Sequence, residues 1–382
     1  MKPGYSGVLL EAPWHCQPWR LVLQSGSLEV SHGLRFLLGI FTDSGLGDGE
    51  LSIIGKGTTN GELPDAAVRG MIQTAKRFAK RIALQMYGSA EKVGLHVLPV
   101  HYYTPIPDRR WLVKNKELWI GRTDLTGIVW ELDDQMRWLR DITGPYYDEI
   151  KGLQAYSEIA AAGFGLGYGP IESQVLHCFL RYVRPKRIVE VGSGVSTACM
   201  AAAVARNGAE GSHRAAITCI EPYPRPPLLA LPAVQVHASL AQAVPQDVFA
   251  SLEGGDVLFI DSSHAVKTGS DDLRLYLEII PNLKPGVLIH IHDVYLPYLY
   301  QRDVLWTAFF WQETALLLAL LNGHSQLRVL CSLSALHYDR SKELAAALTD
   351  YAPQPAVSEG LAEPDAPGHF PSSIYLQTQS SR

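Results

Sequence analysis

The sequence predicts an α/β protein with a largely parallel sheet in its C-terminal part. Three observations support this: short β-branched runs alternate with helical patterns from about residue 155, polar residues follow several runs directly, and the last run follows a Pro-rich segment instead of a helix. Strands that alternate with helices form a parallel sheet covered on both faces. The last strand is the candidate for a different orientation.

Seven runs read as strands. They are "RIVEVG" (187–192), "AITCIEP" (216–222), "VQVHAS" (234–239), "DVLFIDSS" (256–263), "VLIHIHD" (287–293), "LRVLCSL" (327–333) and "SSIYLQTQ" (372–379). Most are separated by helical patterns such as "STACMAAAVARN". We assign this sheet to a catalytic domain over residues 151–382.

The N-terminal part, residues 1–150, has a different character and predicts a smaller α+β extension. It contains strand-like pieces at 19–26, 34–41 and 50–55, one clear helix from about Pro64 to Met86, and a second helical pattern, "LDDQMRWLRDI". We expect this extension to complete a ligand pocket or to serve oligomerisation.

Composition limits the partners. The chain has 382 residues, is 47% hydrophobic and 19% charged, and has a formal net charge of -5. Nucleic acids and anionic membranes usually demand a basic excess, which this chain lacks, so we expect a small-molecule partner and neither of those two. The oligomeric state stays open, a homo-oligomer included.

The cysteines and the apolar runs favour a cytoplasmic protein. Five cysteines are widely spaced, form no CxxC pair and lie mostly in apolar runs, which favours reduced core thiols; they are Cys16, Cys178, Cys199, Cys219 and Cys331. The N-terminus has no long apolar stretch, and "TALLLALL" is too short to span a bilayer. We expect neither a signal peptide nor a membrane anchor.

Ligands of such sheets bind outside the carboxyl ends of the strands. After the first strand comes "EVGSGVST", in which Gly192 and Gly194 permit a tight turn that brings a ligand to a helix N-terminus. A plain tight turn explains the same residues. A dinucleotide fingerprint needs a third glycine where this chain has Thr197, which counts against NAD or FAD. Glu221 ends the second strand, where a carboxylate either binds both ribose hydroxyls or is simply solvated.

The fourth and fifth strands end in titratable residues. If these strands are adjacent, Asp261, His264, His292 and Asp293 converge on the crevice that also contains the glycine turn. A carboxylate after an apolar run is costly without a partner, so a functional role is favoured for these residues. For His290 we prefer a structural role, as a core histidine bonded to a neighbouring carbonyl.

Three motifs in this order carry a resemblance. "RIVEVGSGVSTA", "DVLFIDSSHAVKTGSDD" and "LKPGVLIHIHDVYLPYLY" resemble those of the class I S-adenosylmethionine-dependent methyltransferases, and more closely the bacterial group related to the macrolide sugar O-methyltransferases. "HYYTPIPD" and "LDDQMRWL" resemble the N-terminal extension of that group, which implies that residues 1–150 complete the acceptor pocket or serve oligomerisation. The resemblance implies a Rossmann-like seven-stranded sheet with an antiparallel last strand, and O-methylation of a small molecule in natural product biosynthesis.

The resemblance also implies the site. The donor S-adenosylmethionine would be bound by a set of residues at the strand ends: Glu190, Gly192, Ser193, Gly194, Glu221, Ser239, Leu240 and Asp261. Asp261, His292 and Asp293 match the positions that hold magnesium in the catechol-type and macrolide-type enzymes. His292 replaces an oxygen ligand there, which suits a softer divalent ion. His264, three residues after Asp261, matches the position of the catalytic base and has a suitable pKa range.

Alternatives from other classes stay open. They are an N-methyltransferase on a small molecule or peptide, a nicotinamide-dependent oxidoreductase on a similar sheet, and a non-catalytic protein that binds an adenosyl ligand. An aromatic-rich stretch after the fifth strand contains Tyr295, Trp306 and Trp311, which either contact the acceptor or only pack.

Overall fold

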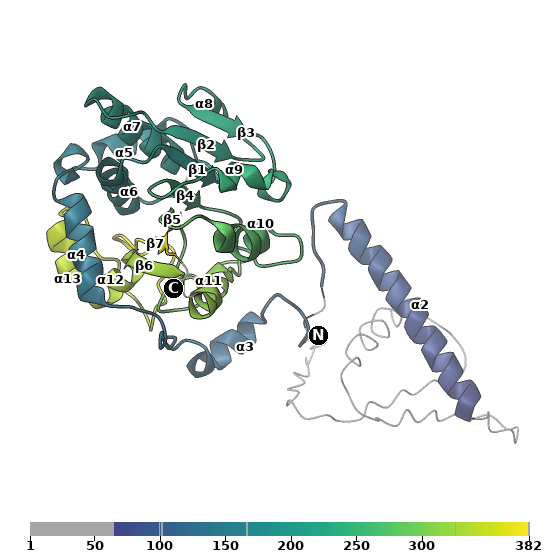
Figure 1. Ribbon diagram of the computed structural model, residues 1–382. Coiled ribbons are helices and arrows are strands. Elements are labelled where there is room, and N and C mark those ends of the chain that lie inside the picture. The colour runs from purple at the N-terminus through teal and green to yellow at the C-terminus, as the bar shows by residue number, and fades with distance from the viewer. Residues whose placement is uncertain (1–64, 99, 101, 166, 325, 381–382) are drawn as a thin grey trace, which may run out of the picture. The chain divides into compact units, whose positions relative to one another are not determined.

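The computed structural model describes residues 65–98, 100, 102–165, 167–324 and 326–380 (Figure 1). Contacts divide the chain into two units, Met1–Asp108 and Arg109–Arg382. In the first unit, helix α2 (Asp65–Glu91) confirms the predicted helix and extends it beyond Met86. The strands predicted before residue 56 lie outside the described residues, as does Cys16.

The second unit is built on a seven-stranded sheet with the strand order β3-β2-β1-β4-β5-β7-β6. Its strands are β1 (Arg187–Val191), β2 (Ala216–Ile220), β3 (Val234–His237), β4 (Val257–Ile260), β5 (Leu288–Ile291), β6 (Leu327–Ser332) and β7 (Ile374–Thr378). Every strand of the sheet is therefore one that the sequence predicts. The chain runs from β1 outwards to β3 and then returns to β4, so the order reverses beside β1.

The last strand has the expected different orientation. β7 pairs antiparallel with β5, where Ile289 lies opposite Leu376, and antiparallel with β6. The pairs among β1 to β5 are parallel. This mixed sheet confirms the fold that the sequence predicts, with the carboxyl ends of the five parallel strands at one edge.

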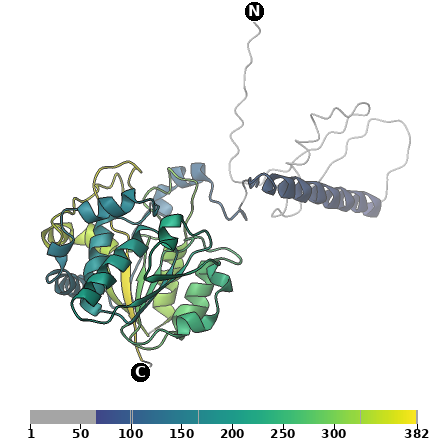
Figure 2. The same cartoon turned by 90° about the horizontal axis from the view of Figure 1, so that it is seen from above.

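Helices cover both faces of the sheet (Figure 2). The helices of this unit are α3 (Arg109–Lys114), α4 (Leu132–Thr143), α5 (Gln154–Ala161), α6 (Pro170–Val183), α7 (Val195–Ala209), α8 (Pro226–Leu229), α9 (Gln246–Ala250), α10 (Asp271–Arg274), α11 (Glu313–Gly323), α12 (Leu333–Asp339) and α13 (Ser341–Ala347). After α10 the helix continues as a π-helical turn, η4 (Leu275–Ile279).

The core consists of two main apolar layers, one on each face. Along β4, Phe259 belongs to the layer that also contains residues of α6 and α7. Its neighbours Leu258 and Ile260 belong to the other layer, together with residues of η4 and α11. Alternate side chains of a strand point to opposite faces, and burial on both faces explains the continuous apolar runs of the central strands.

The segment 109–150, which the sequence groups with the extension, packs within the second unit. Helix α4 contacts α6 and β6, and its Met136, Leu139 and Ile142 are buried in the first core layer. The functional division between residues 1–150 and 151–382 stays a prediction.

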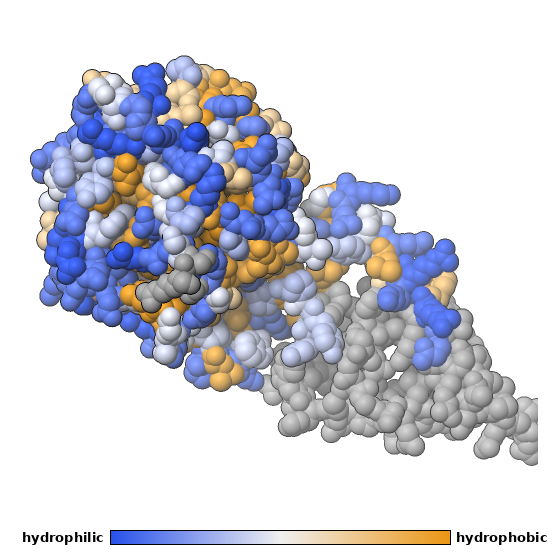
Figure 3. Space-filling view, viewed as in Figure 1, coloured by the Kyte–Doolittle hydropathy of each residue, from blue (hydrophilic) through white to orange (hydrophobic). Residues whose placement is uncertain are grey.

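The four cysteines after Cys16 are buried and free, as expected of reduced core thiols. Among the described helices, none combines the length and the apolar character that a membrane span requires. Apolar and polar residues are interspersed on the face seen in Figure 3.

Candidate active site

The turn after β1 requires glycine at position 192. Gly192 has a φ of 89°, and a Cβ there would lie 2.0 Å from the carbonyl oxygen of Asp261. The amide of Asp261 in turn donates to the carbonyl oxygen of Val191, at 2.9 Å. The close approach of this turn to the end of β4 therefore depends on the absence of a side chain at Gly192.

Thr197 replaces the third glycine and closes the turn. Its hydroxyl accepts from the amide of Gly194 at 3.1 Å and donates to a carboxylate oxygen of Glu190 at 2.7 Å. Ser196 donates to the other oxygen of Glu190, at 2.8 Å. Burial raises the pKa of Glu190 to about 8. Glu190 thus faces the start of α7 and fixes the turn through the hydroxyls of Ser196 and Thr197.

Glu221 lies at the end of β2, beside the same turn. It accepts from the hydroxyl of Ser193 and from the amide of Tyr223, both at 2.8 Å. Ser239 and Leu240 follow β3, one strand further out, and Leu240 is 53% exposed. The structure places all the predicted donor-site residues at the carboxyl edge of the sheet.

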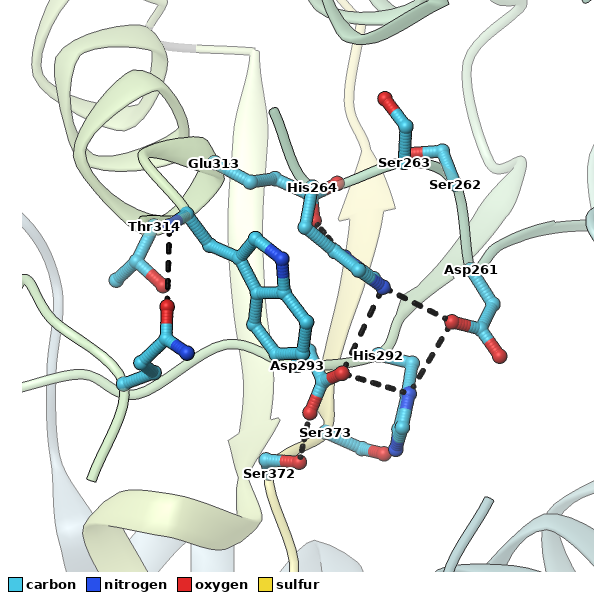
Figure 4. Close-up of polar contacts among 12 residues, drawn as sticks. Asp261, Ser262, Ser263, His264, His292, Asp293, Glu313, Thr314, Ser372 and Ser373 are labelled. Carbon is cyan, nitrogen blue, oxygen red and sulfur yellow. Dashed lines mark hydrogen bonds and ion pairs between the residues drawn. The ribbon is translucent and has the colours of Figure 1, made fainter. Parts of the chain in front are cut away.

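Asp261, His264, His292 and Asp293 form a closed ring in which imidazoles and carboxylates alternate (Figure 4). The Nε2 atom of His264 lies 3.2 Å from Asp261 Oδ1 and 3.5 Å from Asp293 Oδ2. The Nδ1 atom of His292 lies 3.3 Å and 3.6 Å from the same two oxygens. The convergence predicted from the strand ends therefore holds for all four residues.

The backbone at this ring is unusual. His264 and Asp293 both have a φ of 56°, in the left-handed region that residues other than glycine seldom adopt. Such conformations persist where the surrounding structure over-determines them, and they cluster at functional sites.

A buried carboxylate stands behind each imidazole. Glu313, at the start of α11, lies with its Oε2 atom 2.6 Å from Nδ1 of His264 and also accepts from the hydroxyl of Tyr276. Glu172, in α6, lies with its Oε1 atom 3.2 Å from Nε2 of His292. The ring nitrogen that does not face the cluster is thus bound in both histidines, which fixes the tautomer and the ring orientation.

Further hydrogen bonds fix the carboxylates of Glu172 and Asp293. Glu172 accepts from the amide of Ser372 and the hydroxyl of Ser373, at 2.9 and 2.7 Å. Asp293 Oδ1 accepts from the hydroxyls of Ser372 and Tyr295, at 2.9 and 3.1 Å. The loop before β7 therefore supports the cluster, although this part of the chain is far away in sequence.

The carboxylates dominate the electrostatics of the cluster. Burial alone would lower the pKa of His264, but the charge of Glu313 and the hydrogen bond to Asp261 hold it well above its usual value. Burial likewise opposes the charge of His292, and Asp293 and Glu172 raise its pKa well above the usual value. Despite burial, His292 and His264 hold the pKa of Asp261 below its usual value.

The donor set fits a divalent ion. Ligand atoms about 2.1 Å from a common ion in a tetrahedron are about 3.4 Å apart, and the four N···O distances of the ring span 3.2 to 3.6 Å. Imidazoles whose other nitrogen is bound by a carboxylate are the usual metal-ligating histidines. The same ring also fits two protonated imidazoles that donate to two carboxylates.

His290 belongs to the core and not to the ring. Its side chain is fully buried, stacks on Phe259 and lies with Nε2 3.2 Å from the hydroxyl of Tyr168. The expected structural role is confirmed, but its partner is a hydroxyl and not a backbone carbonyl. Burial lowers the pKa of His290 well below the usual value.

A pocket of about 620 Å³ opens beside the ring, lined by His292 and Asp293. Tyr295 and Trp311 also line it, whereas Trp306 is not among its lining residues. The pocket has the size of a site for a small organic molecule. Of the three aromatic residues singled out in the sequence, two are thus positioned to contact an acceptor.

Sequence reasoning missed Glu172 and Glu313. Both stand in otherwise apolar helical runs, "GPIESQVLHC" and "WQETALLL", and both are at least 97% buried. A single acid within an apolar helix is costly unless it has a partner, and this signal was present in the sequence.

Residues 189–294 match a family model described as a methyltransferase domain. No curated protein matches this chain. Among solved structures, the O-methyltransferase TomG of Streptomyces achromogenes is 16% identical, with 64% of this chain and 99% of that one covered and a TM-score of 0.36. An O-methyltransferase from Bacillus cereus is 16% identical, with coverage of 62% and 91% and a TM-score of 0.31.

A third structure, the 1,6-didemethyltoxoflavin-N1-methyltransferase of Burkholderia thailandensis, is 14% identical, with coverage of 68% and 95% and a TM-score of 0.29. At these values no property of the three proteins is transferred to this chain. The strand order with an antiparallel β7 and the match over residues 189–294 carry the assignment. Residues 189–294 thus carry a methyltransferase domain on the Rossmann-like sheet of the second unit, and the chain is a methyltransferase.

Proposed function

We propose that this methyltransferase acts on a hydroxyl group of a small molecule. The observation that carries the proposal is the ring of Asp261, His264, His292 and Asp293 at the wall of the pocket. In the reaction, the acceptor oxygen forms a bond to the methyl carbon while the carbon–sulfur bond breaks and the sulfur leaves as a thioether. The hydroxyl proton must be removed, and the ring is the group that can remove it.

The donor is proposed to bind at the turn after β1. The donor would contact the backbone of Gly192, Ser193 and Gly194 directly, and the carboxylate of Glu221 would bind its ribose hydroxyls. The hydroxyl of Ser193 and the amide of Tyr223 already hold Glu221 in place. Glu190 would stabilise the turn through its hydrogen bonds with Ser196 and Thr197. Ser239 and Leu240 would lie beside the adenine. The role of Thr197 in closing the turn leaves no place for a dinucleotide fingerprint, which disfavours a nicotinamide oxidoreductase.

We propose further that the ring holds a divalent ion through Asp261, His292 and Asp293, with His264 as a fourth ligand. A bound ion would take the acceptor hydroxyl as a fifth ligand, and in this way lower the pKa of the hydroxyl and orient it. Two imidazoles favour an ion softer than magnesium. The alternative is a metal-free site in which Asp261, Asp293 and Glu313 orient the ring of His264. Although burial opposes it, these carboxylates raise the pKa of His264, so His264 accepts the proton only at a pH high enough to leave its imidazole neutral. The narrower likeness to macrolide sugar O-methyltransferases stays a prediction, as does a role in natural product biosynthesis.

The test combines chelation with substitution at His264, in assays of methyl transfer to a panel of hydroxylated small molecules. If the ring holds metal, a chelator abolishes turnover and one divalent ion restores it best. His264→Ala lowers turnover by about 10²- to 10⁴-fold, with donor affinity nearly intact. Resistance to the chelator combined with loss in His264→Ala would establish the metal-free base. Indifference to both treatments would contradict the assignment of proton removal to this ring.

A further inference from the structure

Arg302 is a buried arginine in the wall of the pocket beside the ring. This residue is only 5% exposed, yet it lines the pocket together with His292 and Asp293. It lies in the segment between β5 and α11. A guanidinium stays charged at any pH at which the protein is folded, so its charge must be balanced inside the protein or by a ligand.

The partners of Arg302 are all uncharged. Nη1 lies 3.1 Å from Nε2 of His337, and Nη2 donates to the carbonyl oxygens of Pro355 and Gln354, at 3.1 and 3.4 Å. The guanidinium lies 4.3 Å from the ring centre of Phe370. A guanidinium has five donors, and Nε is buried without a hydrogen-bond partner. Donors therefore remain unused.

The neutrality of His337 follows from this arrangement. The nitrogen that faces Arg302 must accept, so the proton lies on Nδ1, which is 2.6 Å from the hydroxyl of Tyr351. Burial and the charge of Arg302 lower the pKa of His337 to about 3. The histidine therefore does not compensate the charge of Arg302; it only supports the side chain.

Another buried arginine of this chain, Arg181, has charged partners. Arg181 is fully buried and pairs with two carboxylates, Glu149 and Glu210. No residue in the described part of the chain makes such a pair with Arg302, and an unpaired buried charge is costly.

The carboxylates that line the pocket have other roles. Glu172 and Asp293 are bound by the histidines and serines of the site. Asp303 accepts from the side-chain amide of Gln301 at 3.2 Å, and Glu363 is exposed to solvent. An exposed carboxylate is hydrated at little cost, whereas the side chain of Arg302 is only 5% exposed.

We infer that the pocket binds a hydroxylated aromatic acid, whose carboxylate pairs with Arg302 while its hydroxyl lies at His292 and Asp293. A carboxylate balances the charge of a guanidinium and accepts charge-assisted hydrogen bonds from its unused donors, and the two backbone carbonyls hold the guanidinium in place before the ligand arrives. Tyr295, Trp311 and Phe370 line the same pocket and suit a flat ring. This inference rests on the proposed function, for which it names the acceptor class.

The test compares two probes of nearly the same shape, of which only the first carries a negative carboxylate: 3,4-dihydroxybenzoate and 3,4-dihydroxybenzamide. Binding is measured by calorimetry on the full chain with S-adenosylhomocysteine and Mn²⁺ present. The acid is expected to bind about ten- to a hundredfold more tightly than the amide, which is the range of a charge-assisted hydrogen bond. Arg302→Gln is expected to remove this preference, and Arg302→Lys to keep part of it because the charge is retained.

The matched control is Arg122→Gln. Arg122 also lies near a tyrosine ring, that of Tyr298, but it pairs with Asp339 and is not among the residues that line the pocket. This variant should retain the preference for the acid. Affinity for S-adenosylhomocysteine reports whether each variant is folded, and the wild-type comparison of acid with amide stands even if Arg302→Gln does not fold.

Three results would overturn the inference: equal affinity for acid and amide in the wild type, a preference that survives in folded Arg302→Gln, or no binding of the acid by protein that still binds S-adenosylhomocysteine. Each of these leaves the proposed function standing. Failure of the wild type to bind S-adenosylhomocysteine would instead contradict the proposed function.

Discussion

At the scale of single residues, the site depends on pairs of side chains that each fix the other. Glu221 is held by Ser193 and by the amide of Tyr223, so its carboxylate is oriented before any ligand binds. Such preorganisation lowers the entropic cost of binding.

Glu221→Ala is expected to weaken S-adenosylmethionine binding by about ten- to a hundredfold, because charged hydrogen bonds to the ribose are lost. Calorimetric titration measures the effect. Glu253→Ala, which removes an exposed glutamate paired with Lys284, is the control and should bind normally. Normal binding by the Glu221 variant would move the donor site elsewhere.

The carboxylates behind the histidines give a second prediction. Glu313→Gln and Glu172→Gln should each lower the affinity for a divalent ion by about ten- to a hundredfold, because the backing carboxylate orients the ligating imidazole and raises its basicity. Titration with Mn²⁺ measures this without an acceptor. Glu278→Gln, at an exposed position of η4, is the control. Unchanged ion affinity in both variants would argue for the metal-free site.

At the scale of the elements, the glycine turn after β1 couples two strands. Gly192→Ala should abolish donor binding, since a Cβ would lie 2.0 Å from the carbonyl oxygen of Asp261. Gly211→Ala is the matched control: Gly211 has a similar φ of 82°, but nothing lies within 4 Å of its Cβ position. This control should cost only the conformational strain, about 1–2 kcal/mol, and keep donor binding. Equal behaviour of the two variants would show that the contact is unimportant.

Helix α12 contributes a pH dependence of stability through His337. Its folded pKa of about 3 lies below the unfolded value of about 6.5, so the unfolded chain binds the additional proton in this interval. The contribution of His337 to the free energy of unfolding is therefore fully present above about pH 6.5. It is lost as the pH drops towards 3, by up to about 1.4 kcal/mol per pH unit. Urea unfolding of the wild type and of His337→Gln should differ in slope over this range. His213→Gln, at an exposed position, should follow the wild type.

The packing of the elements explains which parts of the fold and of the site could be predicted from the sequence alone. The parallel strands were predictable because burial on both faces makes them short continuous apolar runs, and the residues after each run had to meet at one edge. The sequence signals that Glu172 needs a partner, but which partner Glu172 and Ser372 contact was not predictable in the same way. They reach His292 and Asp293 through the packing of α6 and through the antiparallel return of β7, neither of which leaves a local pattern. Arg302 was missed because a buried arginine looks like any polar residue in a loop.

At the scale of the whole molecule, the compact unit begins near Arg109. We predict that residues 109–382 fold on their own and bind the donor. A piece that begins at residue 151 lacks α4, whose Met136, Leu139 and Ile142 are buried in the core. Burial of three such side chains contributes several kcal/mol, a large share of the stability of a domain. Circular dichroism and donor titration of both pieces test this, and equal stability would contradict it.

If the donor turn after β1 and the ring form one catalytic edge, a crystal soaked with S-adenosylhomocysteine and Mn²⁺ should show an anomalous peak among Asp261, His264, His292 and Asp293. The bound S-adenosylhomocysteine should lie over Gly192, with its ribose at Glu221. An ion bound elsewhere while the ring is empty, or a ligand away from this turn, would show that the turn and the ring do not act together.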